Sequence, residues 1–209
     1  MRSLSTQGGV SANAPEYRHV FLAHVHRLLQ IGYSRLRPVQ FASTEEPTIS
    51  GRIREEIEHF LDEPPAEGWK QFYEVFNENP EDDKWRSGKR RLKTDIRIKS
   101  SRTAPRLRFI FEAKRLRYSR SLDDYLGSEG LRAFLNEDYA KDSLDAGMLG
   151  YVQVSTPNQW ASGIGSRLKG VGWRKQNFAG GPQNTYLSRH TRIPGGSSID
   201  IYHTLLLFC

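Results

Sequence analysis

Two stretches near the middle of the chain alternate between two kinds of side chain. In Lys93–Lys99, Thr94 and two isoleucines alternate with charged residues, and in Arg108–Leu116 small and aromatic residues alternate with a mostly charged set. A period of two, in segments rich in β-branched and aromatic residues, is typical of β-strands. The connection Ser100–Pro105 has the composition of a turn. The pattern therefore predicts a β-hairpin.

Two segments that precede this hairpin repeat their apolar residues with helical spacing. The first runs from Pro15 to about Gly32 and has proline in its first turn. The second is expected to begin at Thr48 or Ser50, whose hydroxyl can cap a helix, and to end near Leu61. Two helices are therefore expected before the hairpin.

The rest of the chain predicts an α/β (α+β) fold, with a central mixed sheet flanked by helices. We expect, in chain order, a strand at Trp69–Asn77, a polar loop at Glu78–Arg90, a helix from about Ser128, a strand at Gly147–Val154, a loop at Lys169–Thr185, and a closing β-hairpin made of Tyr186–Arg192 and Ile199–Phe208. The segment Asn158–Leu168 follows a helix-start signal, but its two glycines weigh against a helix.

The 209 residues suffice for one good-sized domain, or for one domain with an appendage. Residues 1–14 are rich in Ser, Gly, Ala, Asn and Gln and are expected to be disordered. We therefore divide the chain into a disordered tail plus N-terminal helix, residues 1–40, and one domain, residues 41–209.

Positive charge is concentrated around the predicted hairpin. The chain carries a net charge of +7, but the segment from Lys84 to Arg120 holds fifteen Lys and Arg and only two acids, Asp95 and Glu112. Such a local field indicates a polyanionic partner, most simply nucleic acid. Anionic lipid is the poorer alternative, because no amphipathic basic helix coincides with the cluster.

Other classes are excluded or disfavoured by composition. The only cysteine is Cys209, so neither an internal disulfide nor a cysteine-based zinc site is expected. The apolar run Leu205–Phe208 is far too short to cross a bilayer, and Met1–Ala14 lacks the apolar core of a secretory signal. These features predict a cytoplasmic protein without a membrane partner.

The parity of the hairpin suggests a chemistry. Glu112 and Lys114 are two residues apart on one strand, so they point to the same face about 7 Å apart. Asp95 on the neighbouring strand reaches the same patch if the register allows. Two carboxylates suit a hard cation such as Mg2+, and the lysine can orient water and offset developing charge. A solvated surface pair of Glu112 and Lys114 is the alternative.

Asp95, followed after sixteen residues by Glu112-Ala113-Lys114, resembles the signature of the PD-(D/E)xK nuclease superfamily. The family often has proline before its aspartate, where this chain has Thr94. The resemblance covers roughly residues 41–154. It implies a restriction-endonuclease-like core and a metal-dependent endonuclease that hydrolyses DNA with Mg2+, for which Mn2+ can substitute. Small members of the superfamily often serve restriction or anti-phage defence.

The resemblance also implies roles for particular residues. Asp95 and Glu112 would bind the metal, and Lys114 would position the attacking water. Glu46 would add a third carboxylate, because Glu46-x-x-Ile49-Ser50 resembles the opening of the corresponding helix in some branches; its neighbour Glu45 is the alternative. Gln153, after the last core strand, is a further polar candidate. Nucleic-acid contacts are expected from Lys89, Arg90, Arg91, Arg115 and Arg117.

Two other functions stay open. The chain can be a catalytically inactive nucleic-acid-binding subunit, or its N-terminal helix can mediate a homodimer or docking to a larger defence complex. The histidines fit packing or surface roles better than metal binding, and His190 and His203 are more readily structural than substrate-binding. The sequence does not decide between DNA and RNA, nor does it give the cleavage specificity or the oligomeric state.

Overall fold

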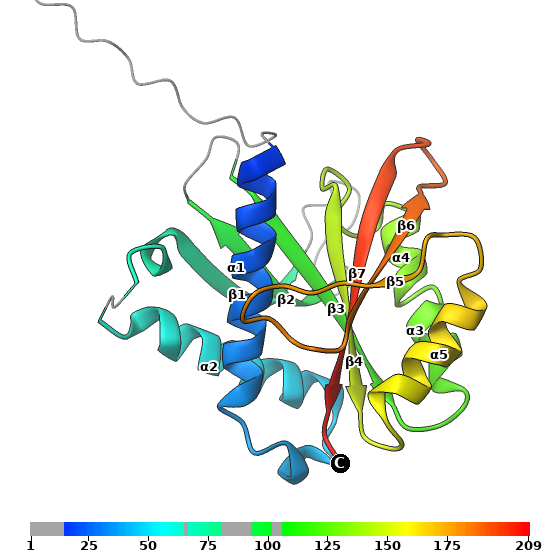
Figure 1. Ribbon diagram of the computed structural model, residues 1–209, viewed down its shortest axis with the longest axis horizontal. Helices are drawn as coiled ribbons and strands as arrows, with labels where there is room; N and C mark the ends of the chain where they lie inside the picture. The colour runs from blue at the N-terminus through cyan, green and yellow to red at the C-terminus, as the bar shows by residue number, and fades with distance from the viewer. Residues whose placement is uncertain (1–14, 65–66, 81–92, 102–105) are drawn as a thin grey trace, which may run out of the picture.

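The computed structural model describes residues 15–64, 67–80, 93–101 and 106–209, which form a mixed α+β fold around a seven-stranded sheet (Figure 1). The helices are α1 (Pro15–Ser34), α2 (Glu46–Asp62), α3 (Ser121–Leu126), α4 (Leu131–Leu135) and α5 (Pro157–Arg167), with 3-10 helices η1 (Pro38–Phe41) and η2 (Lys70–Phe72). The strands are β1 (Tyr73–Pro80), β2 (Lys93–Ser100), β3 (Arg108–Leu116), β4 (Asp145–Val152), β5 (Arg174–Lys175), β6 (Thr185–Thr191) and β7 (Ser198–Leu207). The predicted disordered tail and most of the predicted polar loop after β1 lie outside the described residues.

The sheet has the order β1-β2-β3-β4-β7-β6-β5. The predicted hairpin of β2 and β3 is confirmed, and β1 adds antiparallel to β2. β4 runs parallel to β3, and β7 runs parallel to β4. The closing hairpin of β6 and β7 is also confirmed, and it joins the sheet through β7, which pairs with β4. Because β7 lies in the middle of the sheet, its residues Ile199–Leu206 are buried without interruption.

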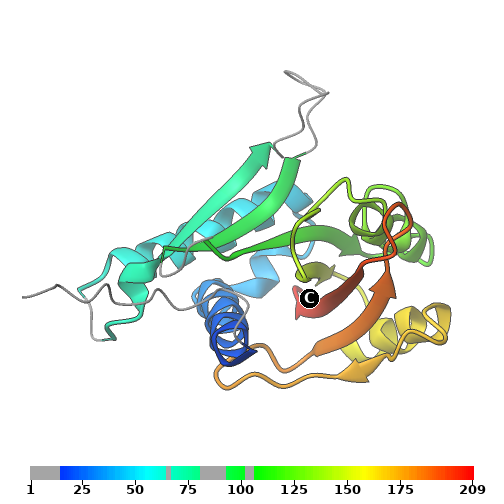
Figure 2. The ribbon, with the colours of Figure 1, turned by 90° about the horizontal axis from the view of Figure 1, so that it is seen from above.

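The helices form two layers on opposite faces of the sheet (Figure 2). The apolar core on one face joins α1 and α2 to the inward residues of the hairpin, which include Ile96, Ile98, Phe109 and Phe111. The core on the other face joins α3, α4 and α5 to β4, β7 and Ile110. Alternation along β2 and β3 thus sends their apolar residues mainly to α1 and α2. Most of their charged residues, including Asp95 and Glu112, lie on the other face, whereas Arg115 shares the face of Ala113 and pairs with Glu45 before α2.

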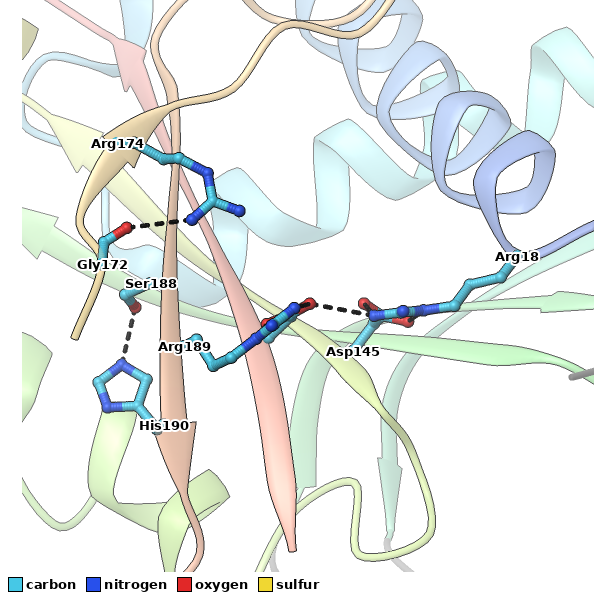
Figure 3. Close-up of polar contacts among 8 residues, drawn as sticks. Arg18, Asp145, Gly172, Arg174, Ser188, Arg189 and His190 are labelled. Atoms are coloured by element: carbon cyan, nitrogen blue, oxygen red, sulfur yellow. Dashed lines mark hydrogen bonds and ion pairs between the residues drawn. The ribbon is translucent and has the colours of Figure 1, made fainter. Parts of the chain in front are cut away.

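Helix α1 is fixed to the sheet by charge as well as by apolar packing. The Arg18 guanidinium donates to both carboxylate oxygens of Asp145 and, at 3.2 Å, to Asp200. Arg189 donates to both carboxylate oxygens of Asp200, at 2.7 and 2.9 Å. Figure 3 shows Arg18 beside Asp145 and the nearby Arg189. The hydrogen bonds that Arg18 donates to Asp145 raise the pKa of Arg18 further above its ordinary value. The apolar side chains of α1 also pack into the core, through Leu22, Val25, Leu28 and Leu29. None of the described helices is both long and apolar enough to cross a membrane.

Several predicted boundaries are corrected. α2 begins at Glu46, before Thr48 and Ser50, because Pro47 takes its place in the first turn. β1 begins at Tyr73, since Trp69 precedes a 3-10 turn and its ring stacks on His24. The helix expected from about Ser128 is reduced to the short α4.

Two helices and one strand differ from what the sequence pattern predicts. α3 was not predicted. α5 forms despite Gly163 and Gly165, because the ring of Trp173 packs where a Gly165 side chain would stand, with Nε1 only 2.7 Å from an added Cβ. The predicted loop between α5 and β6 contains the short strand β5.

Gly147 in β4 lies against the rings of Phe109 and Phe111, two residues of β3. A Cβ at this position would overlap the Phe111 ring and come within 2.8 Å of Phe109 Cε1. We expect Gly147→Ala to lower the free energy of unfolding by about 2 kcal/mol, because the core must shift to admit the methyl group. Urea denaturation measures this loss. Gly68→Ala, where an added Cβ meets nothing within 4 Å, is the matched control; equal midpoints for both variants would contradict the packing argument.

Candidate functional site

Three carboxylates from separate elements converge at the end of the hairpin. Glu46 at the start of α2, Asp95 in β2 and Glu112 in β3 each place a carboxylate oxygen within 4.8 Å of the other two. Glu112 is buried and the other two are partly buried. The three residues that the sequence singled out as acids are therefore one cluster, assembled from positions 66 residues apart.

The register of the hairpin brings the two strand carboxylates together. Ile96 pairs with Phe111, and the next step of the same antiparallel register sets Asp95 beside Glu112. Asp95 Oδ2 accepts the backbone N–H of Ala113 at 2.8 Å. Because this bond ties the Asp95 side chain to β3, the spacing of the two carboxylates is fixed by the backbone as well as by side-chain packing.

Glu46 reaches the cluster from the first turn of α2. Its Oε2 accepts the backbone N–H of Arg115 at 3.1 Å, and its Oε1 lies 3.4 Å from Lys114 Nζ. Glu45 instead lies outside the cluster and pairs with the Arg115 guanidinium at 2.7 Å. The structure thus separates the two neighbours that the sequence left as alternatives, and it brings Glu46 to the site.

Lys114 lies between two of the acids. Its Nζ is 2.8 Å from Glu112 Oε1 as well as 3.4 Å from Glu46 Oε1, and its side chain is only 14% exposed. Burial alone would lower the pKa of this lysine, but the adjacent carboxylates raise it above its ordinary value. Lys114 therefore stays charged at neutral pH, at a fixed position beside the acids.

Burial disfavours charge on two of the acids. It raises the pKa of Glu112 to about 8, and the nearby Asp95 adds to the shift while Lys114 opposes it. Burial likewise raises the pKa of Glu46 to about 7, again against Lys114. Without a bound cation, the cluster therefore holds protons in the neutral range.

One oxygen of the cluster lacks a protein partner. Glu112 Oε2 is buried and has no hydrogen-bond partner among the described residues. A buried carboxylate oxygen without a partner is costly, and the surrounding ligands are all carboxylate oxygens. A hard divalent cation such as Mg2+ suits this donor set, so the residues present fit the metal that the sequence suggested.

A groove of about 650 Å³ adjoins the cluster and is lined at one side by Glu46 and Lys114. Arg115 and Arg117, expected from the sequence to contact nucleic acid, also line it. Lys89, Arg90 and Arg91 lie outside the described residues. Tyr118 and Arg120 also line this groove, although the sequence analysis did not identify them. The sequence signal for them was their position in the turn that follows the E-x-K strand.

Other polar residues support the cluster or lie away from it. Ser50 Oγ lies 2.8 Å from the Tyr151 hydroxyl and 3.5 Å from Asp95 Oδ1, and these two supporting residues were not foreseen. Gln153 was expected to be a polar residue of the site, but its contacts lie elsewhere. Its amide donates to the carbonyl oxygens of Phe41 and Thr44, so it fixes the loop before α2.

The histidines are accounted for by packing. His26 is fully buried against Phe178, and burial lowers its pKa to about 3. His190 and His203 both bond Ser188 Oγ at 2.7 Å within a buried polar chain. These contacts give His26, His190 and His203 structural partners, which is the role that the sequence pattern favoured.

The raised pKa values predict how stability depends on pH. The unfolded chain releases the Glu46 and Glu112 protons near pH 4.5, whereas the fold retains them to about pH 7 and 8. Stability from these groups is therefore present below pH 4.5 and is lost as pH rises through 8. In EDTA, we expect Glu112→Gln to reduce this loss between pH 5 and 9 by roughly 4 kcal/mol, since each unit of pKa shift corresponds to about 1.4 kcal/mol.

Urea midpoints at several pH values test this expectation, with Glu58→Gln on the exposed side of α2 as the control. Parallel pH profiles for wild type and Glu112→Gln would show that the carboxyl group titrates normally.

Comparison of the chain with known protein families, with curated proteins and with solved structures finds no match, so similarity assigns it to no family.

Proposed function

We propose that this protein is a metal-dependent nuclease that hydrolyses phosphodiester bonds in DNA. The observation that carries the proposal is the convergence of Glu46, Asp95 and Glu112 with Lys114 at the end of a basic groove. Two strand carboxylates, one of them buried, a helix carboxylate and a charged lysine at one point form a more specific arrangement than a binding surface requires.

The order of elements supports a restriction-endonuclease-like core. α2 precedes a three-stranded antiparallel meander, β1 to β3, and short helices then lead to β4, which runs parallel to β3. This helix–meander–helix–strand order is the one that the resemblance to PD-(D/E)xK nucleases implies. In this proposal α1 and the β5–β7 segment are additions to that core.

Glu46, Asp95 and Glu112 would hold Mg2+, or Mn2+ in its place. When bound, the ion supplies Lewis-acid polarisation of a phosphoryl oxygen and a lower pKa for water. Lys114 is placed to donate a hydrogen bond at the same point, either to the attacking water or to the charge that develops on phosphate. The bond from the Arg115 N–H holds Glu46 in position for this arrangement.

The charge of the groove favours a phosphate backbone. Arg115, Arg117 and Arg120 line it next to Lys114. Cationic side chains that contact phosphates bind nucleic acid with a strong dependence on salt. The scissile phosphate would therefore be drawn toward the carboxylates by the basic residues beside them, although the carboxylates alone repel it.

Cleavage of DNA by the purified chain tests the proposal. Supercoiled plasmid, linear duplex, single-stranded DNA and RNA are each incubated with Mg2+, with Mn2+ and with EDTA. We expect metal-dependent breaks in DNA and none in EDTA. Tight binding of DNA without cleavage in either metal would overturn the nuclease proposal in favour of a nucleic-acid-binding subunit, and cleavage confined to RNA would change the substrate.

A further inference from the structure

The groove beside the carboxylate cluster is lined by two segments of unlike charge. The end of β3 and the turn after it supply Arg115, Arg117 and Arg120. α3 and the turn that follows supply Asp123, which pairs with Arg167, together with Asp124 and Glu129. Phosphate is attracted to the first segment and repelled by the second. A nucleotide in the groove is therefore oriented, with its backbone along the arginines and its base toward the carboxylates.

Tyr118 is an exposed aromatic residue in the lining of this groove. Its exposed fraction is 65%, and the Arg117 guanidinium lies 5.4 Å from the centre of its ring. An isolated apolar residue at a surface needs no explanation. An exposed ring in a basic groove next to a candidate catalytic lysine is, however, the arrangement by which proteins stack single-stranded bases.

The turn that carries Tyr118 is held by its own hydrogen bonds. Ser121 Oγ accepts the backbone N–H groups of Arg117 and Tyr118, at 3.3 and 3.2 Å. The Ser121 N–H donates in return to the Tyr118 carbonyl oxygen at 2.8 Å. Ser121 itself is buried. The backbone of Tyr118 is thus fixed, and stacking on its ring would cost little ordering of the chain.

The groove is large enough for part of a nucleic-acid strand. Its volume of about 650 Å³ lies in the range of sites for small ligands, roughly 300–1,000 Å³, and admits one or two nucleotides. A base can lie flat on the Tyr118 ring only when it has left the stack of a duplex or belongs to a single strand. The base that stacks on Tyr118 is therefore an unpaired one.

We propose that Tyr118 stacks on an unpaired DNA base beside the scissile phosphate, and that Asp124 and Glu129 select bases that carry an exocyclic amino group. Cytosine and adenine offer exocyclic amino hydrogens that carboxylates accept, whereas unpaired thymine offers only its N3–H, which lies between two carbonyl oxygens that carboxylates repel. The substrate is then single-stranded or frayed DNA, with thymine disfavoured at this position. The position of the scissile phosphate rests on the proposed nuclease function; the binding of the base does not.

Binding to single-stranded oligonucleotides in EDTA tests the stacking without any cleavage. Oligo(dC), oligo(dA) and oligo(dT) of equal length are titrated by fluorescence anisotropy. Loss of the ring in Tyr118→Ala is expected to weaken the binding of oligo(dC) about tenfold, and Tyr118→Trp to retain it. Ile193→Ala, which truncates an exposed apolar side chain away from the groove, is the control and should bind as wild type. Wild-type affinity in Tyr118→Ala would overturn the proposal.

Selectivity is tested with the double variant Asp124→Asn, Glu129→Gln. It should bind all three oligonucleotides more tightly, because two negative charges are removed, and should lose the preference for oligo(dC) and oligo(dA) over oligo(dT). An unchanged ratio would overturn the role of the carboxylates. Cleavage separates the two proposals: if wild type stacks bases but cuts no DNA, the nuclease fails alone. If wild type cuts and Tyr118→Ala matches it on single-stranded and duplex DNA, the stacking fails alone.

Discussion

Asp95→Asn and Glu112→Gln are each expected to lower the rate of DNA cleavage by about a thousandfold or more, because each removes a charge that the metal requires while it keeps the shape of the side chain. Asparagine at position 95 retains an oxygen that can accept the Ala113 N–H, so the strand contact survives. Glutamine at position 112 retains an oxygen for Lys114. The loss would therefore report on the metal rather than on the fold.

Initial rates of plasmid nicking and Mn2+ binding by calorimetry measure the two consequences together. Both should fall in each variant, while the urea midpoint in EDTA stays the same or rises. Glu58→Gln is the matched control, since Glu58 lies on the same helix as Glu46 but pairs with Arg54 at the surface. A variant at Asp95 or Glu112 that still cuts at the wild-type rate would remove the carboxylate cluster from the chemistry.

The hairpin and its polar face could be predicted because their signal is local. Ile96 and Ile98 alternate with Asp95 and Arg97 in a few residues, and burial of the isoleucines under α1 and α2 fixes which side the others take. A one-residue slip would expose the isoleucines, so the register follows from the pattern. The convergence of Asp95 with Glu112 is a consequence of that register.

The place of β7 could not be predicted by the same reasoning. Its partner β4 lies about fifty residues earlier, and parallel pairing leaves no turn signal between the two strands. The continuous burial of Ile199–Leu206 is typical of a central strand, covered on both faces. The sequence of β7 hides this place, because the polar residues Asp200, His203 and Thr204 interrupt its apolar residues although all three are buried.

The distinction between Glu45 and Glu46 also depended on structure. A helix turns by about 100° per residue, so a shift of one residue in the start of α2 decides which carboxylate faces β3. The sequence placed that start at Thr48 or Ser50, and the structure places it at Glu46. Tyr118 and Arg120 were missed because they lie in the turn after β3. The conformation of that turn depends on a hydrogen bond from the Tyr118 N–H to Ser121 Oγ, which the sequence pattern does not reveal.

The largest effect after loss of a carboxylate is expected from Lys114→Met, which should separate catalysis from metal binding. Lys114 makes ion pairs with Glu112 and Glu46, so it competes with a cation for their oxygens. Its removal should leave the affinity for Mn2+ unchanged or increased, because a positive charge beside the metal is lost. Cleavage should nevertheless fall by about a hundredfold or more, since no donor then replaces its hydrogen bond to water or phosphate.

Calorimetry with Mn2+ and single-turnover cleavage of a labelled duplex measure the two quantities on the same preparation. Lys169→Met is the control, since Lys169 is exposed beyond the end of α5 and takes no part in the cluster. Loss of both Mn2+ binding and cleavage in Lys114→Met would mean that the lysine holds the carboxylates in place rather than acting on the substrate. Full activity would mean that it only balances their charge. Unimpaired Mn2+ binding with failed cleavage is the outcome that assigns Lys114 to the chemical step, because the metal site and the fold would then both be intact.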